Sequence, residues 1–258
     1  MNFSLELVLF TSILFVGMLC AAEVGRRIGG AHTRRSGELA QGIDAVEAAV
    51  FGLLALLIAF TFSGAASRFD DRRHLIAEEA NAIGTAYLRV DLLPADAQPE
   101  IRTLFRRYLD VRWDTYRHTA DDVETNAMLR AGAALQSQIW TKAVSACQAP
   151  GVSAPTATLV LSSLNEMFDI TDTRVAATRN HPPQVVFWLL AALCLLAALL
   201  VGYATSRNKE RIWLHTIVFA AILSLTVYVI LEIEYPRRGL IRVDSADQAL
   251  LDLHRTMR

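Results

Sequence analysis

Four stretches of apolar residues without Asp, Glu, Lys or Arg stand out along the 258-residue chain. They cover residues 7–22, 48–67, 182–206 and 212–231. A helix rises about 1.5 Å per residue, so about 20 residues cross a hydrocarbon core of roughly 30 Å. The first stretch is not preceded by the basic residues that open a signal peptide, so we interpret it as a retained helix. The pattern predicts four membrane-spanning helices.

The segment between the second and third stretches is more polar, but apolar side chains recur in it every three or four residues. This is the spacing of one helix face. Four such stripes begin at Ile76, Ile101, Met128 and Leu161. Short connections separate them, and Pro94 ends the first helix. Four helices joined in this way predict a four-helix bundle that stands on the membrane.

The expected fold is therefore all-α: an integral membrane protein with four transmembrane helices and a four-helix bundle inserted between spans 2 and 3. Residues 1–67 hold transmembrane helices 1 and 2 with a short basic connection, and residues 68–181 form the extramembrane bundle. Residues 182–234 hold transmembrane helices 3 and 4, and residues 235–258 form a turn and a short C-terminal helix. No proline interrupts the second helix before Pro94, so we expect it to leave the membrane without a break.

Composition and charge narrow the classes of function. The 25 basic and 26 acidic residues give a net charge of −1, which excludes the basic balance of a general nucleic-acid binder. Three cysteines at these spacings match neither a disulfide framework nor a zinc site. The sequence contains no nucleophile elbow, phosphate-binding glycine loop or paired metal-ligand motif. We therefore expect no enzyme, cofactor or metal site.

The basic residues of the short connections bear on orientation. Four arginines follow the first span and three basic residues follow the third, which places both connections in the cytoplasm by the positive-inside rule. Arginines such as Arg68 and Arg237 also flank the membrane ends on the opposite side. The balance favours termini and bundle on one extracytoplasmic face of a bacterial cell membrane.

The end of the second span carries small, mildly polar residues that suggest a candidate pore. Phe60, Ser63 and Ser67 share one helix face at i, i+3 and i+7, and Arg68 lies one step beyond. In a channel this face would line a narrow hydrated passage, with Phe60 as a hydrophobic constriction that gates by dewetting. Alternatively, the small residues allow close helix packing.

Charged residues follow this face at the base of the predicted bundle. In an oligomer, Arg68, Arg72 and Arg73 would form a positive ring that concentrates small anions at a pore mouth. Interfacial anchoring and ion pairing are the alternative. Further along, a glutamate buried in the bundle would need a partner, and a pair with Arg89 would fix the register of the helices. The charged candidates are Asp71, Arg72, Arg73, Glu78, Glu79, Asn81 and Arg89.

Several motifs resemble the bacterial bestrophin-like domain family of four-span membrane proteins. They are residues 60–73, residues 78–89, Arg107-Tyr108, Leu164-Asn165, Arg174, His181-Pro182 and residues 234–239. The resemblance covers nearly the whole chain with the order of elements intact. It implies the four-span helical fold, and by itself it implies no particular activity.

One of these segments is also similar, more distantly, to the pore segment of bestrophins, which are pentameric anion channels whose second membrane helix lines the pore. Phe60, Ala65, Arg68, Phe69, Asp71 and Arg73 occupy similar places. Thr61, Ser63 and Ala66 replace an Arg, an Asn and a Tyr of that segment, and bestrophins have a larger cytosolic domain. This resemblance implies a cytosolic bundle, contrary to the charge count.

The preferred function is that of a homo-oligomeric channel in the lipid bilayer, with span 2 lining a symmetric axis and a small anion as the conducted species. The rival is a sensory or scaffolding module. Its helical bundle would bind a ligand or partner and pass small helix movements into the membrane.

Overall fold

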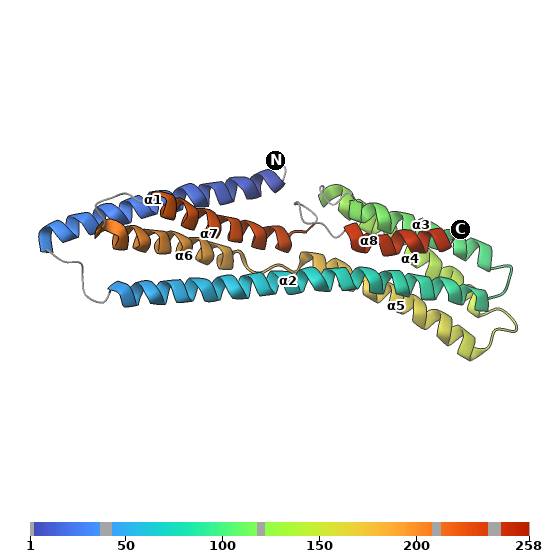
Figure 1. Ribbon diagram of the computed structural model, residues 1–258. Coiled ribbons are helices and arrows are strands. Elements are labelled where there is room, and N and C mark those ends of the chain that lie inside the picture. Colours follow the sequence, from blue (N-terminus) through green and yellow to red (C-terminus); the bar gives the residue numbers. More distant parts are fainter. Residues whose placement is uncertain (1–2, 37–42, 118–121, 208–212, 237–243, 258) are drawn as a thin grey trace. The chain divides into compact units, whose positions relative to one another are not determined.

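The computed structural model describes residues 3–36, 43–117, 122–207, 213–236 and 244–257. Within these ranges every regular element is helical (Figure 1), as predicted for an all-α protein. The α-helices are α1 (Phe3–Ser36), α2 (Ile43–Arg89), α3 (Gln98–Arg117), α4 (Asp122–Cys147), α5 (Ala154–Arg179), α6 (Gln184–Ala204), α7 (Trp213–Glu234) and α8 (Asp244–Thr256). Short 3₁₀ turns extend α2, as η1 (Val90–Leu92), and α6, as η2 (Thr205–Arg207).

Four helical stretches are long and apolar enough to cross a membrane, in agreement with the four predicted spans. They are Ser4–Arg34, Asp44–Leu92, Ala154–Ala204 and Trp213–Glu234. The third includes α5 as well as α6, and its apolar part lies in α6. The chain is therefore a multi-pass membrane protein by length and composition.

Helix α2 runs for 47 residues without interruption. Neither proline nor a positive φ angle occurs within it, and the 3₁₀ turn Val90–Leu92 ends it just before Pro94. The residue before a proline is disfavoured in the α conformation, and Leu93 is accordingly extended. The prediction of one unbroken helix beyond the second span is confirmed.

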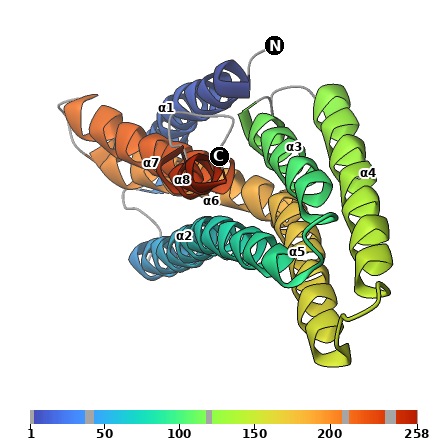
Figure 2. The same cartoon turned by 90° about the vertical axis from the view of Figure 1, so that its right-hand side faces the viewer.

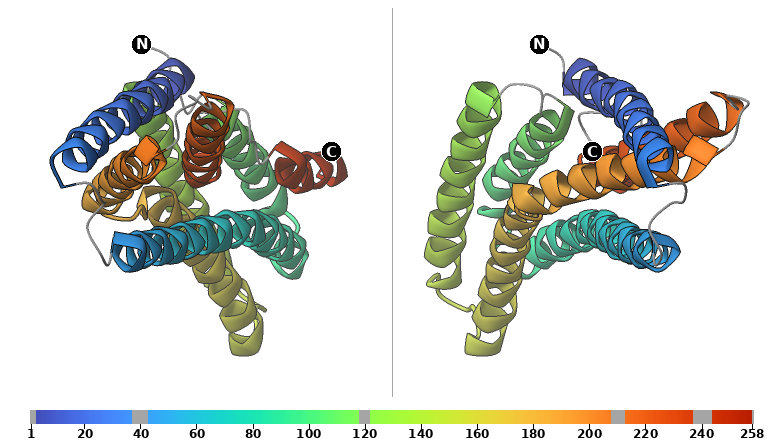
Figure 3. Two further views of the ribbon diagram at one scale, coloured as in Figure 1. Left: turned by 60° about the vertical axis from the view of Figure 1, so that its left-hand side comes forward. Right: turned by 90° about the vertical axis from the view of Figure 1, so that its left-hand side faces the viewer.

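The first compact unit comprises Met1–Ser67 and His181–Ile241. In this unit α1 lies against α6 and α7 (Figure 3), and the four apolar helices share a core. Met18 of α1 and Leu190 and Cys194 of α6 are fully buried in it.

Glycines bring α1 and α6 into backbone contact in this unit. A Cβ atom added at Gly25 would lie 1.9 Å from the carbonyl oxygen of Leu199, and one added at Gly202 would lie 1.9 Å from that of Ala22. Only glycine fits at both positions. Small residues that let backbones approach are a recurrent means of packing helices in membranes.

The second compact unit comprises Arg68–Asn180 and Arg242–Arg258. Its core takes residues from the C-terminal part of α2 and from α3, α4, α5 and α8. Helix α3 packs beside α4 (Figure 2), with Phe105 and Ile139 fully buried. Leu250 of α8 and the adjoining Met257 are 1% exposed, so the C-terminal helix contributes to this core.

The ends of α5 are defined by local chemistry. The Ser153 hydroxyl accepts a hydrogen bond from the backbone N–H of Thr156 at 3.2 Å, which is an N-cap. At the other end Asn180 has an extended backbone, and Pro182 and Pro183 separate α5 from α6. At the start of α4, residues 121–124 (Asp-Asp-Val-Glu) resemble a capping box in the sequence, but Asp121 lies outside the described residues.

Candidate functional site

The membrane part of α2 is the least covered of the four spans. In its most apolar window 6% of the residues are buried against the rest of the chain, compared with 28–39% in the other spans. Leu54 and Ala65 are buried at 3% and 1% exposure, and Phe51 meets Phe219 of α7 edge-on at 5.9 Å. One side of α2 therefore packs within the first unit, and the rest of its surface faces outward.

The three predicted pore residues lie on that uncovered side. Phe60 is 68% exposed, and Ser63 and Ser67 are also exposed. Successive residues of a helix are rotated by roughly 100°, so these three point away from the side that carries Leu54 and Ala65. The structure leaves this face available to lipid or to another copy of the chain.

Arg68 departs from this face. It follows Ser67 directly, so it is rotated by roughly 100° about the helix axis, and it is half-buried in the second unit. The hydroxyl of Thr61 donates within the helix, to the carbonyl oxygen of Leu57 at 2.8 Å. Between Phe60 and Ser67, the polar side chains on the outer face of α2 are therefore Ser63 and Ser67.

Arg72 does not join an exposed ring of arginines. Its side chain is 8% exposed and donates to the carbonyl oxygens of Ala177 at 3.2 Å and of Asn180 at 3.0 Å. These carbonyls end α5, where a cation is favoured by the helix dipole. Arg73 is exposed and lies 3.7 Å from Asp70. Backbone carbonyls bind Arg72, which favours the anchoring alternative for this residue over a place in a ring with Arg68 and Arg73.

Glu79 is the centre of a buried polar cluster in the second unit. Its carboxylate is fully buried and lies between two guanidinium groups. Arg112 of α3 donates from Nε to Oε1 at 2.6 Å, and Arg174 of α5 donates to Oε2. Both arginines are 2% exposed. A carboxylate can be buried here because charged hydrogen bonds compensate for its lost hydration.

Hydrogen bonds extend this cluster to a fourth helix. The Thr171 hydroxyl oxygen lies 3.4 Å from Oε1 of Glu79 and 2.9 Å from the hydroxyl oxygen of Tyr108. Gln136 of α4 donates to that Tyr108 oxygen at 3.1 Å. Burial raises the pKa of Tyr108; Arg112 opposes this rise and Glu79 adds to it. The contacts connect α2, α3, α4 and α5 around one carboxylate.

The other charged candidates stay at the surface or find other partners. Asp71, Glu78 and Asn81 are exposed. Arg89 donates to the carbonyl oxygen of Leu159 at 2.7 Å, so the expected pair between Arg89 and a glutamate is replaced by a backbone contact. Among the described residues no group of three potential ligands could hold a metal ion.

Sequence reasoning missed Arg112 as the partner of Glu79. A signal was present, because Arg112 follows Tyr108 by four residues and so falls on the buried side of α3. Arg174 entered only through a motif of the resemblance, whereas Tyr108 also belongs to the apolar stripe that begins at Ile101. A cation on an otherwise apolar stripe is the pattern that points to a buried ion pair.

A second buried polar group lies in the first unit at the end of α7. Glu234 is fully buried, and its Oε1 lies 2.8 Å from Nδ1 of His181, whose ring stacks on Tyr235 at 4.4 Å. Tyr228 donates to Glu232 at 2.8 Å. Both glutamates lie at the end of the fourth span and are buried, at 1% exposure or less.

Comparison with known proteins identifies the family. The model of the family described as "Bestrophin-like domain" matches residues 13–248. No curated protein matches the chain. Among solved structures, the chain is similar to crystal structures of a bacterial bestrophin homolog from Klebsiella pneumoniae.

Three of these structures illustrate the likeness. One, of a point variant, is 16% identical with a TM-score of 0.68 and covers 96% of this chain and 99% of the other. A second variant is 14% identical with a TM-score of 0.69 and covers 98% and 99%. The structure phased with zinc is 15% identical with a TM-score of 0.68 and covers 96% and 98%. The likeness supports the fold, and the family match over residues 13–248 shows that this chain belongs to the Bestrophin-like domain family.

Proposed function

We propose that this protein is a homo-oligomeric ion channel of a bacterial membrane, with the second span lining the conduction path. In this proposal residues 1–67 and 182–234 lie in the membrane, and residues 68–181 form a helical bundle outside it. Membership of the Bestrophin-like domain family supports this class of function. The observation that carries the proposal is the uncovered face of α2 with Phe60, Ser63 and Ser67.

An oligomer with a central axis accounts for this face. A single chain would expose Ser63 and Ser67 to lipid, where a hydroxyl gains little compared with a hydrated passage. Copies of α2 around an axis would instead turn the serines towards water. Phe60, one turn away, would form the narrow apolar constriction.

The resemblance to bestrophins favours anions as the conducted species. Arg68 is the cation nearest the serines, and a positive potential at a pore mouth attracts anions. Asp71 follows Ser67 by four residues, the spacing at which helical residues share a face, and it is exposed. The sign of the selectivity therefore depends on which of these two charges dominates the mouth, and the proposal assigns that role to Arg68.

Reconstitution in liposomes tests both the conduction of ions and the preference for anions. Purified protein should carry chloride in preference to potassium, as measured by the reversal potential in a salt gradient. Arg68→Glu should shift the reversal potential towards cations. Arg130→Glu, the same charge change on an exposed face of α4, should leave it unchanged.

The results of this experiment distinguish the assignment as a channel from the assignment of anions as the conducted ions. A wild-type channel that prefers potassium would retain the pore and overturn the anion assignment. Purified oligomer that conducts no ion across voltage and pH would overturn the channel and favour the sensory module. Electron microscopy of the same sample adds a second criterion, because a ring with α2 at its axis fits a channel and a solid dimer does not.

A further inference from the structure

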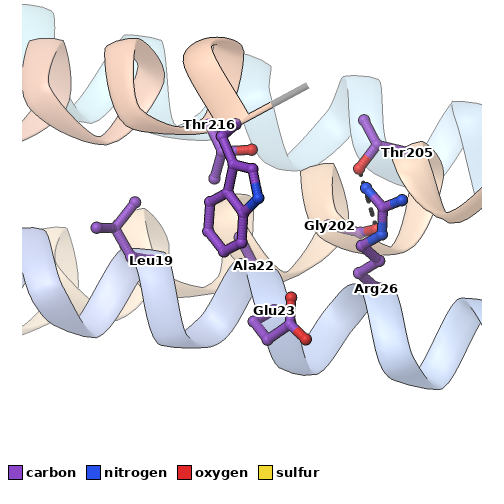
Figure 4. A pocket seen from close by; sticks show the side chains of 8 residues that line it. Leu19, Ala22, Glu23, Arg26, Gly202, Thr205 and Thr216 are labelled. Carbon is purple, nitrogen blue, oxygen red and sulfur yellow. Dashed lines mark hydrogen bonds between the residues drawn. The ribbon is translucent and has the colours of Figure 1, made fainter. Parts of the chain in front are cut away.

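A small pocket lies in the first unit where α1, α6 and α7 meet (Figure 4). Leu19, Ala22 and Arg26 line it from α1, and Thr205 lines it at the end of α6. Trp213 and Thr216, in the first turn of α7, complete it. Arg26 points from α1 towards Thr205 in Figure 4. The pocket thus combines an apolar part with a cation.

Its depth in the membrane follows from the three helices that form it. In α1 the uncharged run ends at Ala22, and Glu23 and Arg26 follow. Helix α6 ends at Ala204, and α7 begins at Trp213. In all three helices the sequence therefore changes from apolar to polar beside the pocket, at the same depth in the membrane. This level is the boundary between hydrocarbon and headgroups, where tryptophan is enriched.

The charges around the pocket favour an anion. Glu23 also lines it, but its Oε1 accepts a hydrogen bond from Nε of Arg27 at 3.0 Å, which offsets the charge of the carboxylate. Arg26 is half-buried and adds a second cation. The Thr205 hydroxyl is directed at the carbonyl oxygens of Val201 at 2.8 Å and of Gly202 at 3.1 Å, and Arg26 is the basic residue among those that line the pocket.

The apolar part of the pocket favours a ligand with a hydrocarbon tail. Leu19 and Ala22 lie one turn apart on α1, towards the membrane interior from Arg26. The contact between Gly202 and the Ala22 carbonyl closes the base between α1 and α6. A free phosphate ion would leave the apolar wall of Leu19 and the Trp213 ring unused.

We propose that this pocket binds an anionic phospholipid, with its phosphate at Arg26 and an acyl chain along Leu19 and Ala22. Basic pockets between membrane helices are suited to anionic headgroups, because a single cation near the surface attracts them and the apolar wall holds the chain. The ring of Trp213 lies at headgroup level beside the phosphate. This proposal is independent of whether the protein conducts ions.

Quenching of Trp213 by brominated lipid tests the site. Replacing Trp113, Trp140 and Trp188 with Phe leaves Trp213 as the only indole in the full chain. In nanodiscs, brominated phosphatidylglycerol should be enriched at Trp213 about fivefold over brominated phosphatidylcholine. Arg26→Gln should abolish this preference. Arg34→Gln removes an equal charge from an exposed residue about two turns further along α1, outside the pocket lining, and should preserve it.

Three results would overturn the proposal. They are equal quenching by the two lipids in the unmutated pocket, an equal loss in Arg26→Gln and Arg34→Gln, and displacement of the preference by inorganic phosphate at constant ionic strength. The last result would assign the pocket to a soluble anion. Should the three tryptophan substitutions prevent folding, native mass spectrometry of the chain with all four tryptophans counts retained phosphatidylglycerol and phosphatidylcholine for the same two arginine variants. The same pattern is expected.

Discussion

Glu79 and Glu78 are adjacent in sequence and have opposite environments. Glu79 is fully buried between Arg112 and Arg174, whereas Glu78 is exposed. A buried charge network provides little net stability relative to an apolar core, but the removal of one member leaves the others buried without compensation. We therefore infer that Glu79 determines which helices meet in this cluster and in which register they pack.

Glu79→Gln should lower the free energy of unfolding by about 3–5 kcal/mol, because two buried guanidinium groups lose their carboxylate. Glu78→Gln should change it by less than about 0.5 kcal/mol, as is usual at exposed positions. Thermal unfolding of the two variants in the same detergent measures the difference. Equal stability of the two would contradict the assigned role.

Tyr108 gives the cluster a dependence on alkaline pH. Burial raises the pKa of Tyr108 above that of an unfolded tyrosine, which is about 10. Between the two pKa values the unfolded chain has lost the proton and the folded chain retains it, so stability falls as pH rises above about 10. The contribution is complete below that pH.

Tyr108→Phe should therefore reduce the loss of stability above about pH 10. At neutral pH it should lower stability by about 1–3 kcal/mol, because its hydrogen bonds with Thr171 and Gln136 are lost. Denaturant unfolding as a function of pH measures both effects. Parallel pH profiles for the wild type and the variant would show that Tyr108 titrates as an exposed tyrosine does.

At the scale of elements, hydrophobic periodicity predicted the helices well. The four spans and the unbroken α2 follow from apolar runs and from the position of Pro94. Which charged residues meet could not be predicted in the same way, because Glu79 is 33 positions from Arg112 and 95 from Arg174. Such pairs depend on how helices pack, and a single sequence does not encode this in any local pattern.

The contact between α1 and α6 also could not be predicted from the sequence. Gly25 and Gly30 look alike in the sequence, but a Cβ at Gly25 would meet the Leu199 carbonyl at 1.9 Å, and one at Gly30 would have nothing within 4 Å. From the sequence, close packing through small residues was considered for the second span. The structure shows that glycine packing joins the first and third spans.

The two glycines should respond oppositely to the same substitution. Gly30→Ala should stabilise α1 by about 0.5–1 kcal/mol, because alanine restricts the unfolded chain and favours the helix. Gly25→Ala should destabilise the protein by about 1–3 kcal/mol, since the backbones must separate. Thermal unfolding of both variants in one detergent provides the measurement. Stabilisation by both would mean that α1 and α6 do not touch at Gly25.

At the scale of the whole molecule, an even number of spans places both termini on one side of the membrane. Basic residues in the connections after spans 1 and 3 assign those connections to the cytoplasm, and we propose an extracytoplasmic bundle on that basis. The resemblance to bestrophins implies the reverse. The charge count and the family likeness therefore predict opposite orientations, which differ in the side of the membrane on which the C-terminus lies.

A reporter fused to the C-terminus tests the orientation. Alkaline phosphatase is active only outside the cytoplasm, so a C-terminal fusion to it should be active. A C-terminal fusion to a fluorescent protein that matures only in the cytoplasm should be dark. The opposite result would place the bundle in the cytoplasm. A second reporter within residues 118–121 should agree with the first, and disagreement would contradict the count of four spans.

The accessibility of Ser63 during conduction is the measurement that bears most directly on the proposed function. In a chain whose Cys20, Cys147 and Cys194 are replaced, Ser63→Cys should react with a small charged thiol reagent, and the reaction should change ion flux into liposomes. Ala65→Cys, on the buried side of the same helix at 1% exposure, should not react. We expect altered flux for Ser63→Cys alone. Ongoing flux with an unreactive Ser63→Cys would contradict a pore lined by the second span.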